Sequence, residues 1–258
     1  MQHISATIIT RNEEKNIERC LIALQGVADE IVVVDSYSTD RTLEICRKYG
    51  CRITSREFHG FGSQRQYATG LTKHSYVLSI DADEMIDDEL IENIKRLKEK
   101  GFEHRVYAIT VKTYFCGEPL AHSGFEPECR VRLFNKRYAN WNLLDVSDRV
   151  AYPDSVQPAR IDGAIHHYRC STIDEFVKKE NRIAALEARV LAAGNQSIWP
   201  STPWLRAAYD YLKLHLANQA WRDGRQGLKI AARRARTTFE AYRMARKILC
   251  EQRANAKA

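Results

Sequence analysis

The chain has 258 residues, of which 44% are hydrophobic and 28% are charged, so it can bury a sizeable core like an ordinary globular protein. Its net charge of +7 favours anionic partners such as nucleotides, nucleic acid or a membrane surface. No apolar run is long enough to span a bilayer and no signal peptide is visible, so we expect a cytoplasmic protein. The seven cysteines are scattered and indicate neither a disulfide framework nor a zinc knuckle.

The first 80 residues alternate between strand and helix patterns. Runs rich in β-branched and apolar residues predict strands over residues 4–10, 30–34, 51–54 and 76–80. Apolar residues at helical spacing predict a helix after each of the first three strands. This alternation predicts a parallel sheet with right-handed crossovers and helices packed on its faces.

Polar side chains follow three of these predicted strands. They are Arg11, Asn12 and Glu13 after the first, Asp35 after the second, and Asp81 and Asp83 after the fourth. Ligands bind outside the carboxyl ends of parallel strands, so we expect all three sets at one edge of the sheet. For any one set, the alternative is helix capping, with Asn12 as an N-cap and Glu13 in a first helical turn.

Two carboxylates with one residue between them can lean to the same side of a strand, as Asp81 and Asp83 do here. Such oxygen ligands suit Mg²⁺ or Mn²⁺, particularly when a diphosphate completes the coordination shell. The turn after the first strand has neither a Gly-x-Gly-x-x-Gly sequence nor a Walker lysine. A bound diphosphate would therefore have to be neutralised by a metal ion and by arginine or lysine.

Four motifs stand in order along this half of the chain. They read Thr10-Arg11-Asn12-Glu13-Glu14, Asp35-Ser36-Tyr37-Ser38, Gly60-Phe61-Gly62-Ser63-Gln64-Arg65 and Asp81-Ala82-Asp83-Glu84. Together they resemble a family 2 inverting glycosyltransferase, and are most similar to the lipopolysaccharide-core β-glucosyltransferase subgroup. The resemblance implies an α/β fold of the GT-A type, with a mostly parallel central sheet flanked by helices and a C-terminal helical extension. It implies a nucleotide-sugar-binding and catalytic domain over 1–170 and a helical, basic region over 171–258.

The resemblance also implies roles for individual residues. The implied nucleotide-sugar site consists of Thr10, Arg11, Asn12, Glu13, Asp35, Gln64, Arg65, Asp81 and Ala82. In this site Asp35 would accept the N3–H of a uracil base, Arg65 would approach the base or the diphosphate, and Asp81 would contact ribose or the donor sugar. Asp83 would ligate Mg²⁺ or Mn²⁺. The structural alternatives are a turn acid for Asp35 and a solvated helix face for Arg65.

The pattern of the second half predicts a helix over 87–100 and strands over 105–115 and 131–134. The candidate catalytic base follows the second of these strands. An inverting transferase needs a base that takes the proton from the acceptor hydroxyl. The segment after the second strand resembles a family block that usually ends Val-His-Glu, and Asp148 stands where that Glu would be. Asp148 is the predicted base and Asp145 the second candidate, with a surface turn acid as the alternative for Asp148.

Three side chains in this half have two open interpretations each. His166 and His167 could ligate a metal or neutralise a leaving diphosphate, and they could equally lie in a loop without a function. Trp141 could stack on an acceptor sugar or fill the core.

From residue 172 onward the pattern is helical, with apolar stripes and many basic side chains. The basic residues of the last helix are Arg225, Lys229, Arg233, Arg236, Arg243 and Lys247, and Trp199, Trp204 and Trp221 lie nearby. Three explanations compete: docking on an anionic membrane, nucleic-acid binding, and a solvated helix pair packed on the domain. We expect an anionic membrane surface bound through residues 200–250, and no nucleic acid.

The expected activity is metal-dependent, inverting transfer of a hexose, with glucose expected, from a UDP-sugar to a saccharide or lipid-linked saccharide such as the lipopolysaccharide inner core. The expected location is peripheral, on the cytoplasmic face of the inner membrane. One alternative is a sugar-phosphate nucleotidyltransferase, which would need a glycine-rich loop after the first strand that this chain lacks. Another is a non-enzymatic basic module that binds membranes or nucleic acid, which leaves the acidic strand ends unexplained.

Overall fold

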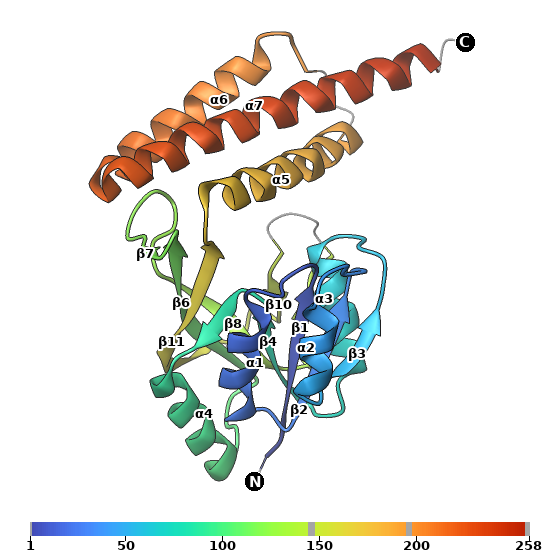
Figure 1. The fold of residues 1–258 in the computed structure, drawn as a ribbon, viewed down its shortest axis with the longest axis vertical. Coiled ribbons are helices and arrows are strands. Elements are labelled where there is room, and N and C mark those ends of the chain that lie inside the picture. Colours follow the sequence, from blue (N-terminus) through green and yellow to red (C-terminus); the bar gives the residue numbers. More distant parts are fainter. Residues whose placement is uncertain (1, 144–147, 195–197, 256–258) are drawn as a thin grey trace. The chain divides into compact units, whose positions relative to one another are not determined.

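A computed structural model describes residues 2–143, 148–194 and 198–255, and Figure 1 shows its helices and strands. The chain forms two compact units, Met1–Lys112 with Pro127–His167 and Thr113–Glu126 with Tyr168–Ala258. Each unit has its own buried apolar clusters. The assignment of catalysis to 1–170 and of a separate basic region to 171–258 stays a prediction.

The first unit is built on a mixed sheet. Its parallel part consists of β3 (Arg52–Ser55), β2 (Glu30–Asp35), β1 (Ile4–Thr10) and β4 (Tyr76–Asp81), in this spatial order. The sheet continues beyond β4 with β8 (Glu128–Asn135), β6 (Val106–Phe115), β11 (Ala159–Cys170) and β5 (Glu84–Ile86). Strand β8 is antiparallel to β4 and β6, and β9 (Asn140–Trp141) forms a separate antiparallel pair with β10 (Val150–Ala151).

The helices of this unit follow the sequence pattern. They are α1 (Ile17–Gln25), α2 (Thr42–Lys48), α3 (Phe61–Leu71) and α4 (Asp88–Lys100). Helix α1 buries the apolar residues that recur at helical spacing, Ile17, Cys20, Leu21 and Leu24. Helix α4 begins after Asp87, whose carboxylate accepts the Leu90 N–H, and stops at Gly101, where φ is +94°.

The ends of the parallel strands confirm the predicted edge. Thr10 pairs with Asp35 and Ile9 pairs with Asp81, so β1, β2 and β4 end level with one another. Strand β1 is buried almost throughout, as expected for a central strand covered on both faces. The polar residues that follow these strands therefore share one edge of the sheet.

The second unit contains three long helices, α5 (Ile173–Ala193), α6 (Thr202–Leu212) and α7 (Gly224–Asn255). A π-helical turn η1 (Lys213–Ala217) and a 3₁₀ turn η2 (Ala220–Asp223) connect α6 to α7, and the short strand β7 (Glu118–Pro119) pairs with the end of β6. Helices α5 and α6 both pack against α7 (Figure 1). Within the described part of the chain, no helix combines the length and apolar character needed to cross a membrane.

Candidate functional site

The loop after β1 is tied to the loop after β2 by side-chain hydrogen bonds. The Asn12 N–H donates to Ser38 Oγ at 2.8 Å, and Asn12 Oδ1 accepts the Thr39 N–H at 2.8 Å. Asn12 has φ +56°, a left-handed conformation that asparagine tolerates better than most residues. The capping interpretation of Asn12 is wrong, because α1 begins after Asn16, and Glu13 instead accepts a hydrogen bond from the Asn16 side chain at 2.7 Å.

Asp35 lies fully buried at the end of β2. Its carboxylate accepts the Ser38 N–H at 2.9 Å and the Ser38 hydroxyl at 2.5 Å, so it shapes the turn after the strand. Each carboxylate oxygen has two lone pairs, and further acceptor capacity for a base N–H is left. Neighbouring Thr10 is also buried, and its hydroxyl has no partner among the described residues.

Arg65 of α3 joins two of the predicted site acids. Its Nη2 lies 2.7 Å and 2.8 Å from the two carboxylate oxygens of Asp81, and its Nη1 donates to Asp148. Only 8% of Arg65 is exposed, so the solvated helix face is wrong for this residue. Its guanidinium lies 4.8 Å from the ring centroid of Trp141, which is itself buried. The structure thus brings Asp148 to the edge where β4 ends.

The charges of this cluster perturb each other. Burial alone would lower the pKa of Arg65, but the carboxylates of Asp81 and Asp148 raise it further above its usual range. Burial alone would raise the pKa of Asp81, yet Arg65 and Arg132 lower it overall. Asp81 and Arg65 are therefore both ionised at neutral pH.

A second buried ion pair, missed by the sequence reasoning, supports the acidic turn. Glu84 is fully buried, lies 2.6 Å from Arg132 Nη2, and accepts the Asp81 N–H at 2.8 Å. Arg132 of β8 is 4% exposed, and its Nε and Nη1 have no partner within the described residues. The sequence places Arg132 in a strand but gives no sign that it faces Glu84, which begins β5 and lies 48 residues earlier in the chain.

Asp83 and His167 face each other at the same turn. His167 Nε2 lies 3.4 Å from Asp83 Oδ2, and the two side chains are 21% and 13% exposed. Burial alone would lower the pKa of His167, but the adjacent Asp83 carboxylate raises it overall. Both histidines belong to β11, so the loop interpretation is wrong, and His166 instead lies 3.5 Å from the capping carboxylate of Asp87.

This pair fits a divalent metal that is shared with a ligand. The Asp83 carboxylate oxygen is a suitable donor for both Mn²⁺ and Mg²⁺, whereas the His167 imidazole nitrogen suits Mn²⁺ better, because Mg²⁺ prefers oxygen ligands. In the described ranges no group of three or more His, Cys, Asp or Glu side chains could hold a metal. Diphosphate oxygens and water would therefore have to complete the shell around Asp83 and His167.

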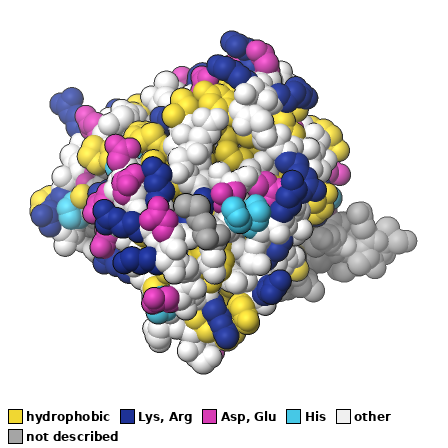
Figure 2. Space-filling model, turned by 90° about the horizontal axis from the view of Figure 1, so that it is seen from below, with side chains coloured by type: hydrophobic (Ala, Val, Ile, Leu, Met, Phe, Trp, Pro, Cys, Tyr) yellow, Lys and Arg dark blue, Asp and Glu magenta, His cyan; other side chains and the backbone are white. Residues whose placement is uncertain are grey.

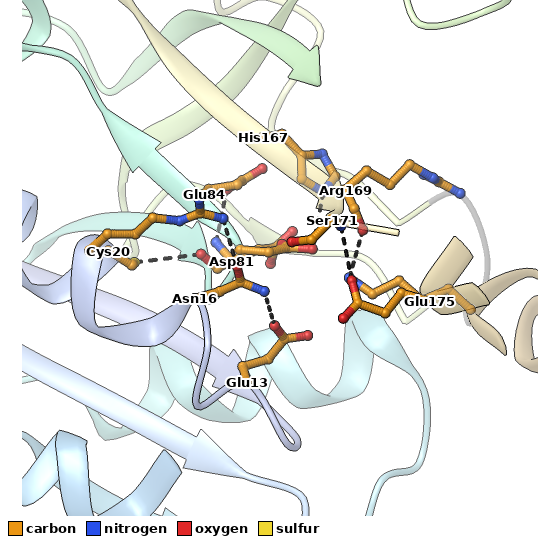
Figure 3. Close-up of polar contacts among 12 residues, drawn as sticks. Glu13, Asn16, Cys20, Asp81, Glu84, His167, Arg169, Ser171 and Glu175 are labelled. Carbon is orange, nitrogen blue, oxygen red and sulfur yellow. Dashed lines mark hydrogen bonds and ion pairs between the residues drawn. The ribbon is translucent and has the colours of Figure 1, made fainter. Parts of the chain in front are cut away.

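The remaining predicted residues take up different positions. Gln64 is fully buried and donates to Ser36 Oγ at 3.1 Å, which anchors α3 to the turn after β2, so its approach to a nucleotide stays a prediction. Arg11 is exposed, and Ala82 is buried between the two aspartates. Asp145 lies outside the described residues. Figure 3 shows Glu13, Asp81, Glu84 and His167 gathering from four segments of the chain.

A family profile and several related proteins assign this chain to the same family. The profile described as Glycosyl transferase family 2 matches residues 5–152. An uncharacterized glycosyltransferase of Rickettsia bellii (strain RML369-C) is 31% identical over 199 residues, which cover 73% of this chain and 67% of that protein. The lipopolysaccharide core biosynthesis glycosyltransferase LpsC of Rhizobium meliloti (strain 1021) is 28% identical over 231 residues, which cover 87% of this chain and 84% of LpsC.

One solved structure with a similar segment is glucosyl-3-phosphoglycerate synthase of Mycobacterium tuberculosis, crystallised with Mn²⁺, UDP and glucosyl-3-phosphoglycerate. The similarity has a TM-score of 0.33 at 24% identity and covers 44% of each chain. The profile match, by contrast, spans more than half of this chain and includes β1, β2 and β4 with the acidic residues at their ends. The chain is a glycosyltransferase with a GT-A fold and belongs to glycosyl transferase family 2.

Proposed function

We propose that this enzyme is an inverting, metal-dependent hexosyltransferase that uses a UDP-sugar, with glucose as the expected sugar. The observation that carries the proposal is the meeting of Asp81, Asp83 and Asp148 around Arg65 and His167 at the carboxyl edge of the parallel strands. The proposed acceptor is a saccharide of the lipopolysaccharide inner core, in line with the name of the relative LpsC.

The proposed donor site begins at β1 and β2. Asp35 accepts the N3–H of uracil, and the loop of Arg11, Asn12 and Glu13 lines the nucleotide. The hydrogen bonds between Asn12 and the Ser38 loop support this role because they hold both loops in place before a ligand arrives.

Asp83 and His167 would hold the metal, with Mg²⁺ and Mn²⁺ as the candidates. When bound, the metal supplies positive charge that offsets the negative charge of the departing diphosphate. Among the described residues, Arg65 and Arg132 form ion pairs with Asp81, at 2.7 Å and 3.8 Å. The unpaired N–H groups of Arg132 support a further contact with an anion.

Asp148 is the proposed base. It removes the proton of the acceptor hydroxyl while that oxygen bonds to the anomeric carbon, and the bond from this carbon to the diphosphate breaks on the opposite face. In the ligand-free arrangement Arg65 holds Asp148. A bound diphosphate would compete for Arg65 and free the Asp148 carboxylate, so the base would become available once the donor is in place.

A lipid-linked acceptor would keep the enzyme on the cytoplasmic face of the inner membrane as a peripheral protein. The excess of basic residues supports this part of the proposal, since that membrane face is anionic.

The experiment that tests the proposal is a transfer assay with UDP-glucose, Mn²⁺ and a truncated lipopolysaccharide core as acceptor. We expect UDP release that depends on acceptor and metal, and a product whose anomeric configuration is opposite to that of the donor by NMR. Retention of configuration would contradict the inverting mechanism. Release of pyrophosphate from a nucleoside triphosphate would instead support a nucleotidyltransferase.

A further inference from the structure

Helix α6 exposes its most apolar side. Leu205, Tyr209, Leu212 and Leu216 recur at helical spacing through α6 and η1, and 53% to 68% of each is accessible to solvent. A different side of the helix is attached to α7 by a polar contact, in which Asp210 accepts a hydrogen bond from the Thr238 hydroxyl at 2.5 Å. This orientation is the reverse of an ordinary surface helix, which turns its apolar stripe toward the core.

Three exposed tryptophans lie in the same stretch of chain as this stripe. Trp199, Trp204 and Trp221 are 73%, 69% and 57% exposed, whereas the fourth tryptophan of the chain, Trp141, is buried. Trp204 still contacts the ring of Phe239 at 4.5 Å between centroids, so it is held in place while most of its surface faces solvent. We name the four residues of the stripe and these three tryptophans the α6 face. Seven large apolar side chains that stay exposed within one short stretch of chain indicate an interaction surface.

The exposed charges in the stretch of chain that carries the α6 face all have one sign. Between Trp199 and Lys229 the exposed charged residues are Arg206, Lys213, Arg222, Arg225 and Lys229. The two acids of this stretch are used internally: Asp210 binds Thr238, and Asp223 binds the Ser123 hydroxyl at 2.6 Å. Elsewhere the signs mix, as Figure 2 shows for one face of the molecule, where basic and acidic side chains are interspersed.

Three basic residues further along α7 have polar partners on the protein. Arg234 pairs with Glu187 at 3.1 Å, Arg243 pairs with Glu240 at 2.7 Å, and Arg233 hydrogen-bonds the Asn181 side chain. The exposed basic side chains of Trp199–Lys229 lie in a stretch without an exposed acid, whereas α7 also carries exposed cations further along, at Arg236, Arg246 and Lys247.

We infer that the α6 face docks on a bilayer that carries anionic lipids. Exposed tryptophan and tyrosine with leucines and a cationic border are the composition of interfacial membrane anchors. Nucleic acid would satisfy the charges but leave the leucines uncovered. A symmetric dimer through this face would bring the same five basic side chains of two copies together, which opposes association. The biological purpose of this docking rests on the proposed lipid-linked acceptor. The exposed side chains that support docking do not depend on that proposal.

Vesicle co-sedimentation of the full chain tests the apolar part of this inference. Leu205→Gln/Leu212→Gln/Leu216→Gln keeps helix propensity and removes exposed side chains only. We expect its partitioning onto vesicles of phosphatidylglycerol and phosphatidylethanolamine to fall at least about tenfold relative to wild type. The control Ile22→Gln/Val190→Gln changes apolar side chains that are 57% and 48% exposed elsewhere, and should bind as wild type does.

A double substitution of two basic residues tests the contribution of the exposed cations to membrane binding. Arg225→Gln/Lys229→Gln should weaken binding about fivefold per charge, and the loss should shrink at high salt. The control Arg246→Gln/Lys247→Gln removes the same charge from exposed positions of the same helix outside the stretch, and should have a smaller effect. Brominated lipids should quench tryptophan fluorescence in wild type.

Three results would overturn the inference. They are equal binding of wild type to neutral vesicles and to anionic vesicles, unchanged binding of the leucine variant, and a solution dimer that the leucine variant abolishes. UDP-sugar turnover without vesicles, measured on the same samples, separates this inference from the proposed function. Vesicle binding without any turnover would contradict the proposed function and support the docking face. Turnover without vesicle binding would support the proposed function and contradict the docking face.

Discussion

Arg65 holds Asp148 by a hydrogen bond from Nη1, and its other terminal nitrogen binds both oxygens of Asp81. Asp148 follows Arg65 by 83 residues, and the contact brings the predicted base to the edge of the parallel strands. Because Arg65 occupies the Asp148 carboxylate, this contact describes a resting arrangement that ligand binding has to change.

Asp148→Asn removes the proposed base and keeps the size of the side chain. We expect kcat for transfer to fall by about 10²–10⁴-fold, because the acceptor hydroxyl loses its proton acceptor. The affinity for UDP, measured by calorimetry, should not fall, since Asp148 is not proposed to touch the nucleotide and its removal leaves Arg65 free for the diphosphate. A variant that transfers sugar at the wild-type rate would exclude Asp148 as the base and direct attention to Asp145.

The pair of Asp83 and His167 predicts how the enzyme depends on metal. Asp83→Asn and His167→Gln should each raise the Mn²⁺ concentration needed for half-maximal activity by about 10- to 100-fold or more. The melting temperature should change little, because both side chains are partly exposed and their contact is 3.4 Å long. His166→Gln is the matched control, and its Mn²⁺ requirement should be that of wild type. Full activity of the wild type in EDTA would contradict the metal site.

The buried pair of Glu84 and Arg132 predicts a stability effect. Arg132→Met leaves the Glu84 carboxylate buried without its cation, and we expect a loss of about 3–5 kcal/mol in the free energy of unfolding. Glu84→Gln/Arg132→Met removes both charges and should recover part of that loss. Urea unfolding of the single and double variants gives the coupling between the two sites. Additive losses would show that the pair does not act as a unit.

Asp29 predicts the pH dependence of stability. Burial alone would raise its pKa, but hydrogen bonds from Lys98, the Ile4 N–H and His3 lower it from the ordinary 3.8 to about 2. A carboxylate with a lowered pKa stabilises the folded state above its unfolded pKa, and this contribution disappears as pH falls from about 4 to about 2.

At pH 7 we therefore expect Asp29→Asn to lose about 2 kcal/mol of unfolding free energy, since one pKa unit corresponds to about 1.4 kcal/mol. The difference from wild type should shrink as the pH falls below about 4, measured by urea unfolding over a pH series. A constant difference over the whole series would mean that Asp29 contributes through packing and not through its charge.

The edge of the sheet could be predicted because it depends on local patterns. The apolar runs that end at Thr10, Asp35 and Asp81 were sufficient to place three polar sets together. The burial of Arg65 and its contact with Trp141 could not be predicted, since helix α3 gives no local sign of which partner covers it. The Glu84–Arg132 pair was missed for the same reason, because it depends on pairing between distant strands.

The C-terminal helices show another limit of pattern reasoning. Helical spacing predicts apolar stripes from residue 172 onward, but it does not say whether another element covers a stripe such as that of Leu205, Leu212 and Leu216. In the structure α7 packs on the other side of α6, where Asp210 is bonded. The exposed stripe is therefore a result of tertiary packing and not of the local sequence.

The most direct test of the account is calorimetric titration of the protein with UDP-, GDP- and CDP-sugars, with and without Mn²⁺. We predict saturable binding of UDP-sugars in Mn²⁺, at least about tenfold weaker binding without the metal or in Asp83→Asn, and no comparable binding of GDP- or CDP-sugars. Binding of no UDP-sugar in the presence of Mn²⁺, or equal binding with and without the metal, would contradict the claim that these strand ends hold a nucleotide and a cation together.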